Sequence, residues 1–591
     1  VGVFNHNALI EMNLFGINSM EVIKGPSSSI YGSEAIGGAI NFITPKPTSV
    51  PTATAGIQFD NQGYKRTQFQ GGGYVNEKLG FYASGLVSQQ RDGWQTYSDY
   101  DKLALNLRAD YTLNAGNKLI FSHAFANYDS QTGGTVDSAA FYARRYATNN
   151  SFTYRKVKAF RSKLTLEHRW NAQDALTATA FYRYNDYGQL PSYRIRQIAK
   201  NPAAATGEIN TSLFHSFGSL VQTQHSFGWL KSKLTGGLWA DYSPNSYQAN
   251  FIAITRNPQT GFFSSYTNRP DSMLTDYSAR LLNTAAYAQY EIEPVKGARL
   301  VLGGRYDRID YTYDNHLGAG AFSGAPDAKN SFTAFSPKAG FTYTFSPALV
   351  AYANFARGFS PPTINQLYSG VQVPFLKPAS FSNYETGAWG ALFDQKLSWD
   401  LALYWMNGKN EIASYRLPDN YTENRNSGST RHYGIEYSVT YKPNPEWYIR
   451  VGGTNAVHQY IDYAVSANLN YNGKIMPSAP KFVLNGEVQY KPAYIPNFRI
   501  AAEYQRIGPY FLENDNLYAY DDATLFGFRG VSVVNFRAGY TIKGIEAFLN
   551  MINASNELYA NNGSRGSFGR TYTPAAPRTF VIGLQYAFSN E

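Results

Sequence analysis

Arginine and tyrosine side chains are interleaved in two segments of the chain. The first segment runs from 141 to 158 and the second from 193 to 196. A guanidinium group binds carboxylate or phosphate oxygens through parallel N–H donors, and tyrosine rings offer a surface on which planar groups stack. The sequence therefore predicts a site for an anionic, aromatic small molecule, formed by Tyr142, Arg144, Arg145, Tyr146, Tyr193, Arg194 and Arg196. The alternative is that these residues meet lipopolysaccharide phosphates or are simply solvated.

The chain shows no set of residues suited to catalysis. It has no His-Glu-x-x-His run and no Gly-x-Ser-x-Gly run, and Gly318-Ala319-Gly320 lacks the Gly-Lys-Ser/Thr that would complete a phosphate-binding loop. The eight histidines are scattered and there is no cysteine, which excludes disulfides and cysteine metal sites. We expect a binding protein rather than an enzyme, with no catalytic residue, no metal site and no cofactor.

The composition favours a membrane barrel. Aromatic residues make up 16% of the 591 residues, charged residues also 16%, and the mean hydropathy is −0.38. No apolar run approaches the roughly 20 residues of a membrane-spanning helix. A chain that is polar on average yet rich in Tyr and Phe fits a transmembrane β-barrel, whose strands face lipid on one side and a wet lumen on the other. A very large soluble β-sandwich array is the alternative.

The charge points to an anionic partner. The formal net charge is +10 and the pI is about 9.2. Nucleic acid is a poor candidate because no run of Lys and Arg and no known binding motif accompanies this charge. Lipopolysaccharide, or a negatively charged small molecule, fits better.

Residues alternate with a period of two along much of the chain, most clearly near the C-terminus. Phe580, Ile582, Leu584, Tyr586 and Phe588 alternate with smaller or polar residues. We interpret the first set as the lipid face of a strand and the second set as its lumen face, because successive side chains of a strand point to opposite sides. Segments 176–185, 398–405 and 498–505 repeat the pattern.

Short and long connections also alternate. Short turns are expected at 76–78, 114–117, 171–174, 346–348, 394–396 and 443–445. Long loops are expected near 129–158, 188–222, 243–282, 312–332, 358–382, 409–430, 458–480, 509–530 and 553–577. Short turns at one rim and long loops at the other are typical of outer-membrane barrels. Strands laid between these marks number about 22, as in a barrel large enough to need a plug.

The segment from Ile17 to Thr44 carries the most specific motif. It contains Met20-Glu21-Val22-Ile23-Lys24-Gly25-Pro26, then Tyr31-Gly32, then Ala35-Ile36-Gly37-Gly38-Ala39-Ile40-Asn41-Phe42-Ile43-Thr44. It resembles the end of the plug domain of TonB-dependent outer-membrane receptors, and later segments such as 354–363, 383–387, 434–436 and 577–578 also resemble that family in its order. The resemblance implies an all-β transmembrane antiparallel barrel of about 22 strands. Residues 1–46 would be the C-terminal part of the plug, a remnant inside the lumen, and residues 47–591 the barrel. One departure is the C-terminus, where Phe588 takes the place of the terminal aromatic residue.

The resemblance also implies a function and partners. We expect active uptake of a scarce ligand, with a ferric siderophore as the leading candidate, across the outer membrane of a Gram-negative bacterium. Cobalamin, heme, another metal chelate and an oligosaccharide stay open within this class, and a non-transporting surface barrel is the alternative from another class. The TonB complex would bind an upstream segment before Val1. The barrel is expected to be a monomer in contact with lipopolysaccharide, and a surface lipoprotein is a candidate partner.

Three charged residues match family positions at which plug and barrel meet. Lys24 stands at the basic position of the plug, and Glu385 and Glu436 stand at acidic positions of the barrel wall. A buried charge that lacks a partner costs several kcal/mol. The resemblance therefore implies a lock between plug and barrel made by Lys24, Glu385 and Glu436. The alternative is that Lys24 is merely exposed at a plug turn.

Overall fold

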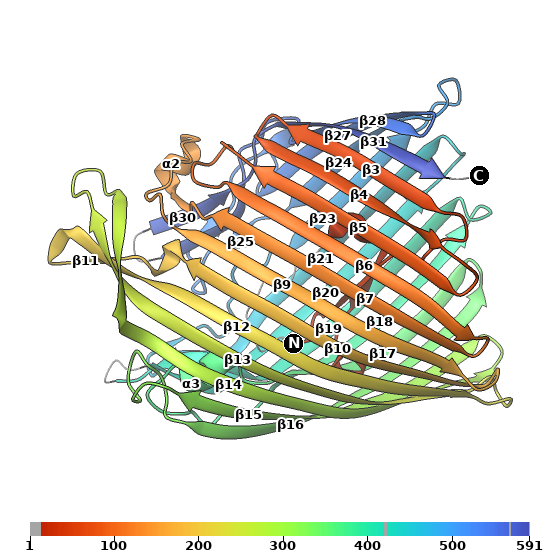
Figure 1. The fold of residues 1–591 in the computed structure, drawn as a ribbon, viewed down its shortest axis with the longest axis horizontal. Helices are drawn as coiled ribbons and strands as arrows, with labels where there is room; N and C mark the ends of the chain where they lie inside the picture. Colours follow the sequence, from red (N-terminus) through yellow and green to blue (C-terminus); the bar gives the residue numbers. More distant parts are fainter. Residues whose placement is uncertain (1–12, 419–421, 567–568, 590–591) are drawn as a thin grey trace.

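The computed structural model describes residues 13–418, 422–566 and 569–589, so the first twelve residues of the predicted plug remnant lie outside it. Twenty-two long antiparallel strands close into one barrel, and β3 and β31 pair to complete it (Figure 1). The prediction of an all-β barrel of this size is confirmed. The long strands are β3 (Thr52–Asp60), β4 (Tyr64–Tyr74), β5 (Leu79–Gln90), β6 (Tyr100–Asn114), β7 (Asn117–Gln131), β9 (Tyr154–Arg169), β10 (Asp174–Leu190), β12 (Asn201–Ser226), β13 (Lys233–Arg256), β14 (Phe263–Val295), β15 (Ala298–Asn315), β16 (Ala328–Ser346), β17 (Leu349–Ser360), β18 (Ala379–Leu392), β19 (Leu397–Arg416), β20 (Thr422–Tyr441), β21 (Trp447–Ser466), β23 (Phe482–Tyr490), β24 (Phe498–Ile507), β27 (Val531–Ile542), β28 (Ile545–Ile552) and β31 (Thr579–Ser589). Two short strands, β11 (Arg196–Ile198) and β22 (Leu469–Asn470), extend the sheet.

The described part of the chain holds no helix of the length and apolarity needed to cross a membrane.

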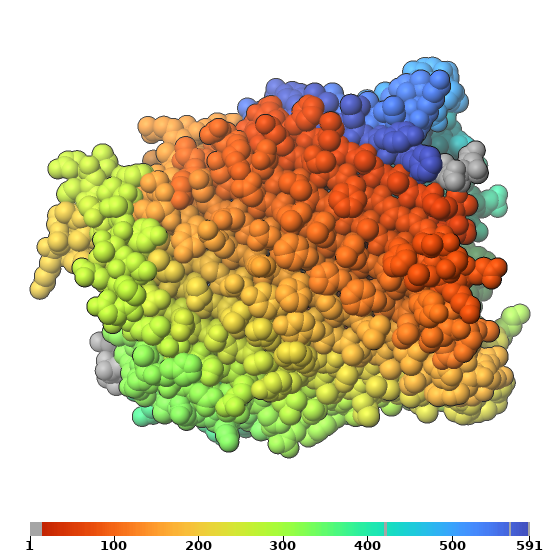
Figure 2. Space-filling model, in the orientation of Figure 1, coloured from red at the N-terminus to blue at the C-terminus, as the bar shows by residue number. Residues whose placement is uncertain are grey.

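The predicted faces of the strands are confirmed by the exposure of their side chains. In β31, Ile582 and Leu584 of the outer face are about half exposed, whereas Val581, which points to the opposite face, is 6% exposed. In β19, Leu401, Leu403 and Trp405 are exposed on the same outer face. An apolar outer face and a polar inner face are what a strand between lipid and a wet lumen requires. Figure 2 shows the side chains of the strands forming an unbroken wall on one side of the barrel.

Three of the predicted long loops are wrong as loops. Much of 188–222 and 243–282 belongs to β12, β13 and β14, which are 26, 24 and 33 residues long, and most of 409–430 belongs to β19 and β20. A β-strand needs about 9–11 residues to cross a membrane, and these strands stay paired with their neighbours well beyond that length. Pairing supplies the backbone hydrogen bonds that a loop of the same length would have to find elsewhere. The spacing between short turns had suggested loops here, but the pairing partners of these segments decide the conformation.

The remaining connections gather at one end of the barrel, at the left of Figure 1, and the short turns lie at the other end. The loop end carries α2 (Ser138–Tyr142), α3 (Ile364–Tyr368) and the 3-10 turns η2 (Ser192–Arg194) and η3 (Leu525–Gly527). It also carries the short strands β8 (Val136–Asp137), β25 (Tyr510–Phe511), β26 (Ala519–Tyr520), β29 (Ala560–Gly566) and β30 (Gly569–Pro574). β8, β30 and β29 form a small sheet of their own.

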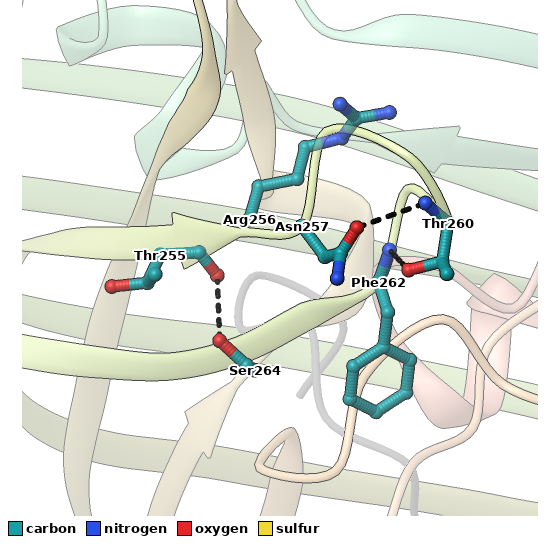
Figure 3. Close-up of a pocket in the computed structure, with 6 residues that line it drawn as sticks. All are labelled: Thr255, Arg256, Asn257, Thr260, Phe262 and Ser264. Atoms are coloured by element: carbon teal, nitrogen blue, oxygen red, sulfur yellow. Dashed lines mark hydrogen bonds between the residues drawn. The ribbon is translucent and has the colours of Figure 1, made fainter.

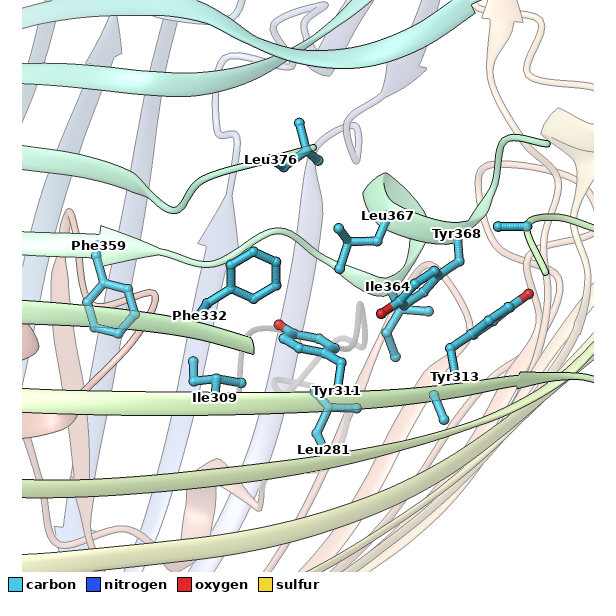
Figure 4. Packing of buried hydrophobic residues seen from close by; sticks show 12 residues of the cluster. Leu281, Ile309, Tyr311, Tyr313, Phe332, Phe359, Ile364, Leu367, Tyr368 and Leu376 are labelled. Carbon is cyan, nitrogen blue, oxygen red and sulfur yellow. The ribbon is translucent and has the colours of Figure 1, made fainter. Parts of the chain in front are cut away.

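The loop that contains α3 packs against the inner wall (Figure 4). Leu367 and Tyr368 of α3 join Ile309, Tyr311 and Tyr313 of β15 in a buried apolar cluster. The rings of Tyr313 and Tyr368 are stacked with centroids 4.3 Å apart. The Tyr311 hydroxyl donates to the carbonyl oxygen of Pro362 at 2.9 Å. This loop is therefore held to the wall.

The plug segment lies against the inner wall of the barrel. It consists of η1 (Leu14–Gly16), the hairpin of β1 (Ser19–Lys24) and β2 (Gly38–Ile43), and α1 (Ser28–Tyr31) in the hairpin connection. The hairpin falls within the segment 17–44 that carries the plug motif. α1 contacts β15, β16 and β17, and η1 contacts β5. The hairpin connection therefore reaches one part of the wall and the start of the segment reaches another.

Candidate functional site

Lys24 reaches the barrel wall at the end of β1. Its Nζ lies 2.5 Å from Oε2 of Glu436 in β20. The side chain of Lys24 is 55% exposed and that of Glu436 is 25% exposed. The same Glu436 oxygen has no partner in hydrogen-bond geometry, so the contact is an ion pair without a well-directed hydrogen bond.

Glu385 lies next to the plug but has other partners. Its Oε1 accepts hydrogen bonds from the Tyr352 hydroxyl at 2.7 Å and from Asn354 Nδ2 at 3.5 Å. Its Oε2 would lie 3.5 Å from a Cβ atom added at Gly25 of the plug. The structure thus brings all three predicted lock residues to one region, with Lys24 paired to Glu436 and Glu385 bonded within the wall.

A more deeply buried plug contact was missed from the sequence. Arg305 of β15 is 3% exposed and Asp307 is fully buried. The Nε of Arg305 donates to both carboxylate oxygens of Asp307, at 3.0 and 2.9 Å, and its Nη1 donates to the carbonyl oxygen of Ile30 at 3.2 Å. A plug carbonyl is therefore held by a guanidinium that the wall itself fixes. The i, i+2 spacing of Arg305 and Asp307 on one face of a strand is the only sequence signal for it.

Gly32 makes this approach possible. Its φ is +83°, a conformation that side-chain-bearing residues rarely adopt, and an added Cβ would lie 3.1 Å from Arg305 Nη2. Two further contacts secure the same turn. Glu34 N donates to Phe359 O at 3.0 Å, and the Ser360 hydroxyl donates to Glu34 Oε1 at 2.6 Å. The Tyr-Gly step of the motif thus serves the close packing of plug on wall.

The first Arg/Tyr group lies on and after α2 at the loop end. Tyr142 donates from its hydroxyl to both oxygens of Asp522, at 2.9 and 3.0 Å. Partial burial, together with hydrogen bonding to Tyr572 and Asp522, raises the pKa of the Tyr142 hydroxyl well above its usual range. Arg144 donates to the carbonyl oxygen of Asn556 at 2.8 Å. Two of the predicted ligand residues therefore connect one loop to the loops at 508–530 and 553–578.

The other predicted ligand residues are mostly exposed. Arg145 is exposed and Tyr146 is partly buried. In the second group, Tyr193 is 60% exposed. Arg194 forms a long ion pair of 3.5 Å with Glu208. Arg196 donates to the carbonyl oxygens of Tyr193 and Ile195. The structure places both groups at the loop end, on separate loops.

A surface hollow at the tip of the β13–β14 hairpin is shown in Figure 3. Asn257 Oδ1 accepts from Thr260 N at 3.0 Å, and the Ser264 hydroxyl donates to Thr255 O at 3.4 Å. These polar groups therefore form hydrogen bonds with other residues of the same hairpin. The hollow also stands away from the plug, so we do not assign it as the ligand site.

The structure also joins two histidines that are far apart in sequence. His432 of β20 and His458 of β21 are register partners, and their Nδ1 atoms lie 2.8 Å apart. In the sequence the eight histidines appear scattered, but the fold places these two side by side. Within the described residues, no group of three His, Cys, Asp or Glu could hold a metal ion.

Comparison with known proteins decides the family. Residues 47–562 match the family model "TonB dependent receptor-like, beta-barrel", and residues 2–39 match the "TonB-dependent Receptor Plug Domain". This chain belongs to the TonB-dependent receptors. The receptor is 21% identical to the probable TonB-dependent siderophore receptor PiuA of Acinetobacter baumannii, over 97% of this chain and 82% of PiuA. It is 19% identical to the ferrioxamine receptor of Yersinia enterocolitica, over 93% of this chain and 77% of that receptor.

The fold of the receptor is also that of solved family members. The crystal structure of PiuA from Acinetobacter baumannii superposes with a TM-score of 0.81, at 17% identity, over 97% of this chain and 87% of that chain. The plug match and the barrel match follow one another along the chain as the fold requires. The predicted boundary at residue 46/47 stays a prediction.

Proposed function

We propose that this receptor takes up a ferric siderophore across the outer membrane of a Gram-negative bacterium, with energy delivered by the TonB complex. The observation that carries the proposal is a closed 22-strand barrel whose lumen holds a plug hairpin bonded to the wall. A plug fixed to the wall inside the lumen suits gated passage of a bound ligand better than passive diffusion. Relatives named as siderophore receptors support the ligand class.

The loop end supplies the capture surface in this proposal. Exposed guanidinium groups such as Arg145 and Arg196, with tyrosine rings such as Tyr193, suit an anionic chelate with aromatic groups. Tyr142, Arg144, Tyr146 and Arg194 complete the proposed set. Arg144 and Tyr142 would also hold the loops that present the other residues, because both bond to neighbouring loops.

The plug contacts supply the gate. In the Lys24–Glu436 pair the lysine side chain is 55% exposed and the glutamate side chain 25% exposed, so water reaches the lysine and weakens the pair. The Arg305–Ile30 contact is buried and holds the turn more firmly. A pull transmitted from TonB would have to break a small number of such contacts. Contact with lipopolysaccharide, a monomeric state and a surface lipoprotein partner belong to the same proposal.

Growth under iron starvation tests the function. A strain that lacks the gene should fail to use one or more ferric siderophores from a panel that also contains heme, cobalamin and other metal chelates. Restoring the gene should restore growth on the same compound only. Equal growth of both strains on the whole panel, with the protein present in the outer membrane, would overturn the proposal.

Binding of the identified chelate tests the residues. Replacing Arg144, Arg145, Arg194 and Arg196 with Ala should weaken binding and reduce its dependence on ionic strength, because exposed charges are screened over about 10 Å at 0.1 M salt. The matched control replaces Lys78, Lys231, Lys296 and Lys396 with Ala, which removes the same charge at the short-turn end. Equal affinities for the two variants would show that the loop arginines do not bind the chelate and are solvated surface residues.

A further inference from the structure

Three side chains on adjacent strands form a row on the inner face of the wall. Met406 of β19 is the register partner of His432 of β20, and His432 is the partner of His458 of β21. Side chains opposite each other on neighbouring strands have Cβ atoms about 4.5–5.5 Å apart. His432 stands four residues before Glu436 in the same strand, so both share the face that meets plug residue Lys24. All three side chains of the row are partly exposed.

The two imidazole rings are close enough to bind one ion. Their Nδ1 atoms are 2.8 Å apart. With metal–nitrogen bonds of about 2.0–2.1 Å, that separation gives a nitrogen–metal–nitrogen angle of about 84–89°. This is the angle between neighbouring ligands in tetragonal geometry, which Cu(II) prefers, and it is smaller than a tetrahedral angle. A metal at this point would replace the hydrogen bond between the rings.

A second layer of contacts fixes the ring of His432. Its Nε2 lies 2.9 Å from the Thr430 hydroxyl, which is buried and also bonds to Glu411 Oε1. When Glu411 is ionised, the Thr430 hydroxyl donates to it and accepts the Nε2–H of His432. The Nδ1 of His432 then carries its lone pair toward His458. Ligand histidines are commonly oriented by such outer hydrogen bonds.

We propose that Met406, His432 and His458 form a copper-binding site on the lumen wall of this receptor. Two imidazoles suit Cu(II), and a thioether adds affinity for Cu(I). Binding leaves the proton count of the neutral pair unchanged, because His458 moves its proton from Nδ1 to Nε2 when Nδ1 becomes a ligand. The third member of this site is a methionine thioether rather than a further His, Cys, Asp or Glu side chain.

The site lies beside the plug contacts. Asn383 of β18 is the register partner of Met406. The Nδ2 of Asn383 would lie 3.0 Å from a Cβ atom added at plug residue Gly25. An ion held between His432 of β20 and His458 of β21 would therefore lie two strands from β18, whose Asn383 faces the turn that follows Lys24. The proposal does not depend on siderophore uptake, and its failure would leave that function untouched.

Copper binding to the purified receptor in detergent is the test. Cupric sulfate should bind one ion per chain, and pulsed electron paramagnetic resonance should detect two coordinated imidazoles. His432→Gln and His458→Gln should each lower cupric affinity more than about 10-fold, and Thr430→Val should lower it about 10-fold through loss of ring orientation. Met406→Leu should weaken binding of cuprous ion, measured by chelator competition, more than binding of cupric ion.

The control is His215→Gln, which removes a histidine whose Nδ1 contacts the Tyr182 hydroxyl elsewhere on the barrel. It should leave copper affinity unchanged. Wild-type affinity in the His432→Gln/His458→Gln double variant would assign the pair to a hydrogen bond only and overturn the proposal. A spectrum of the wild-type protein with one or no coordinated imidazole would overturn it as well, and that measurement needs no variant to fold.

Discussion

At the scale of residues, two cations hold the plug to the wall with very different burial. The Lys24 side chain is 55% exposed, whereas Arg305 is 3% exposed. A charge pair open to water contributes about 1 kcal/mol or less, while breaking a buried pair by removing one partner costs about 3–5 kcal/mol. The family motif pointed to Lys24 as the principal lock. Burial assigns the larger energetic role to Arg305.

These magnitudes predict different outcomes for two matched substitutions. Lys24→Met should change the melting temperature little, because its pair with Glu436 is screened. Arg305→Met should lower the melting temperature clearly and increase leakage of small solutes, because it leaves Asp307 buried without its partner. Thermal melts and a liposome-swelling assay would measure both effects. Equal effects of the two variants would show that burial does not set the strength of the lock.

At the scale of elements, α2 and the β8–β30–β29 sheet form one packed unit at the loop end. Phe141 of α2 is fully buried and stacks on Tyr572 of β30 with ring centroids 4.5 Å apart. Tyr520 of β26 is 1% exposed, and its hydroxyl accepts a hydrogen bond from Ala560 N. Three loops that are distant in sequence therefore share a small apolar core. Such a core keeps the exposed arginines beside it in a fixed arrangement.

Removal of one ring from this core should loosen the whole unit. Tyr572→Ala deletes the ring that packs on Phe141, and loss of a buried aromatic side chain typically costs about 3–5 kcal/mol. We expect faster hydrogen–deuterium exchange in 136–146 and 560–574, with exchange in the barrel strands unchanged. Tyr193→Ala, at a 60% exposed position, is the control and should leave exchange in these segments as it was. Faster exchange confined to residue 572 and its neighbours in sequence would contradict a shared core.

At the scale of the whole molecule, the barrel separates an apolar outer face from a polar lumen with a repeat of two residues. Leu584 and Gln585 are neighbours in β31, yet Leu584 is 49% exposed on the outer face and Gln585 belongs to the inner face. One face of the strand therefore contacts lipid and the other contacts the polar lumen. The inner face can hold charges such as Glu436 because water and the plug reach it.

Neighbouring substitutions in β31 should reveal this difference. Leu584→Arg places a cation in lipid, which costs about 2–4 kcal/mol near the middle of the membrane. Gln585→Arg places the same cation in the lumen and should be tolerated. Heat-modified mobility on SDS gels, which distinguishes folded from unfolded barrels, would measure both. A Gln585→Arg barrel less stable than Leu584→Arg would reverse the assignment of the two faces.

The sequence by itself determined the features that depend on local pattern. The alternation from Phe580 to Phe588 defined the two faces of a strand, the spacing of short turns and long loops gave the number of strands, and the motif around Gly25 and Gly32 identified the plug segment. Each strand face, turn and motif is set by a few consecutive residues, and the strand number follows from counting the turns along the chain. The strand period and the backbone freedom of glycine are local properties, so no neighbouring strand was needed to interpret them.

Only the tertiary structure decided which distant residues meet. His432 and His458 are 26 residues apart, and Ile30 and Arg305 are 275 residues apart. Their contacts depend on the register between neighbouring strands and on where the plug sits in the closed barrel. A shift of one residue in register would turn a side chain to the opposite face. Most of the predicted loop 188–222 became strand because pairing with neighbouring strands satisfies its backbone groups, and such pairing cannot be seen in the sequence of one segment.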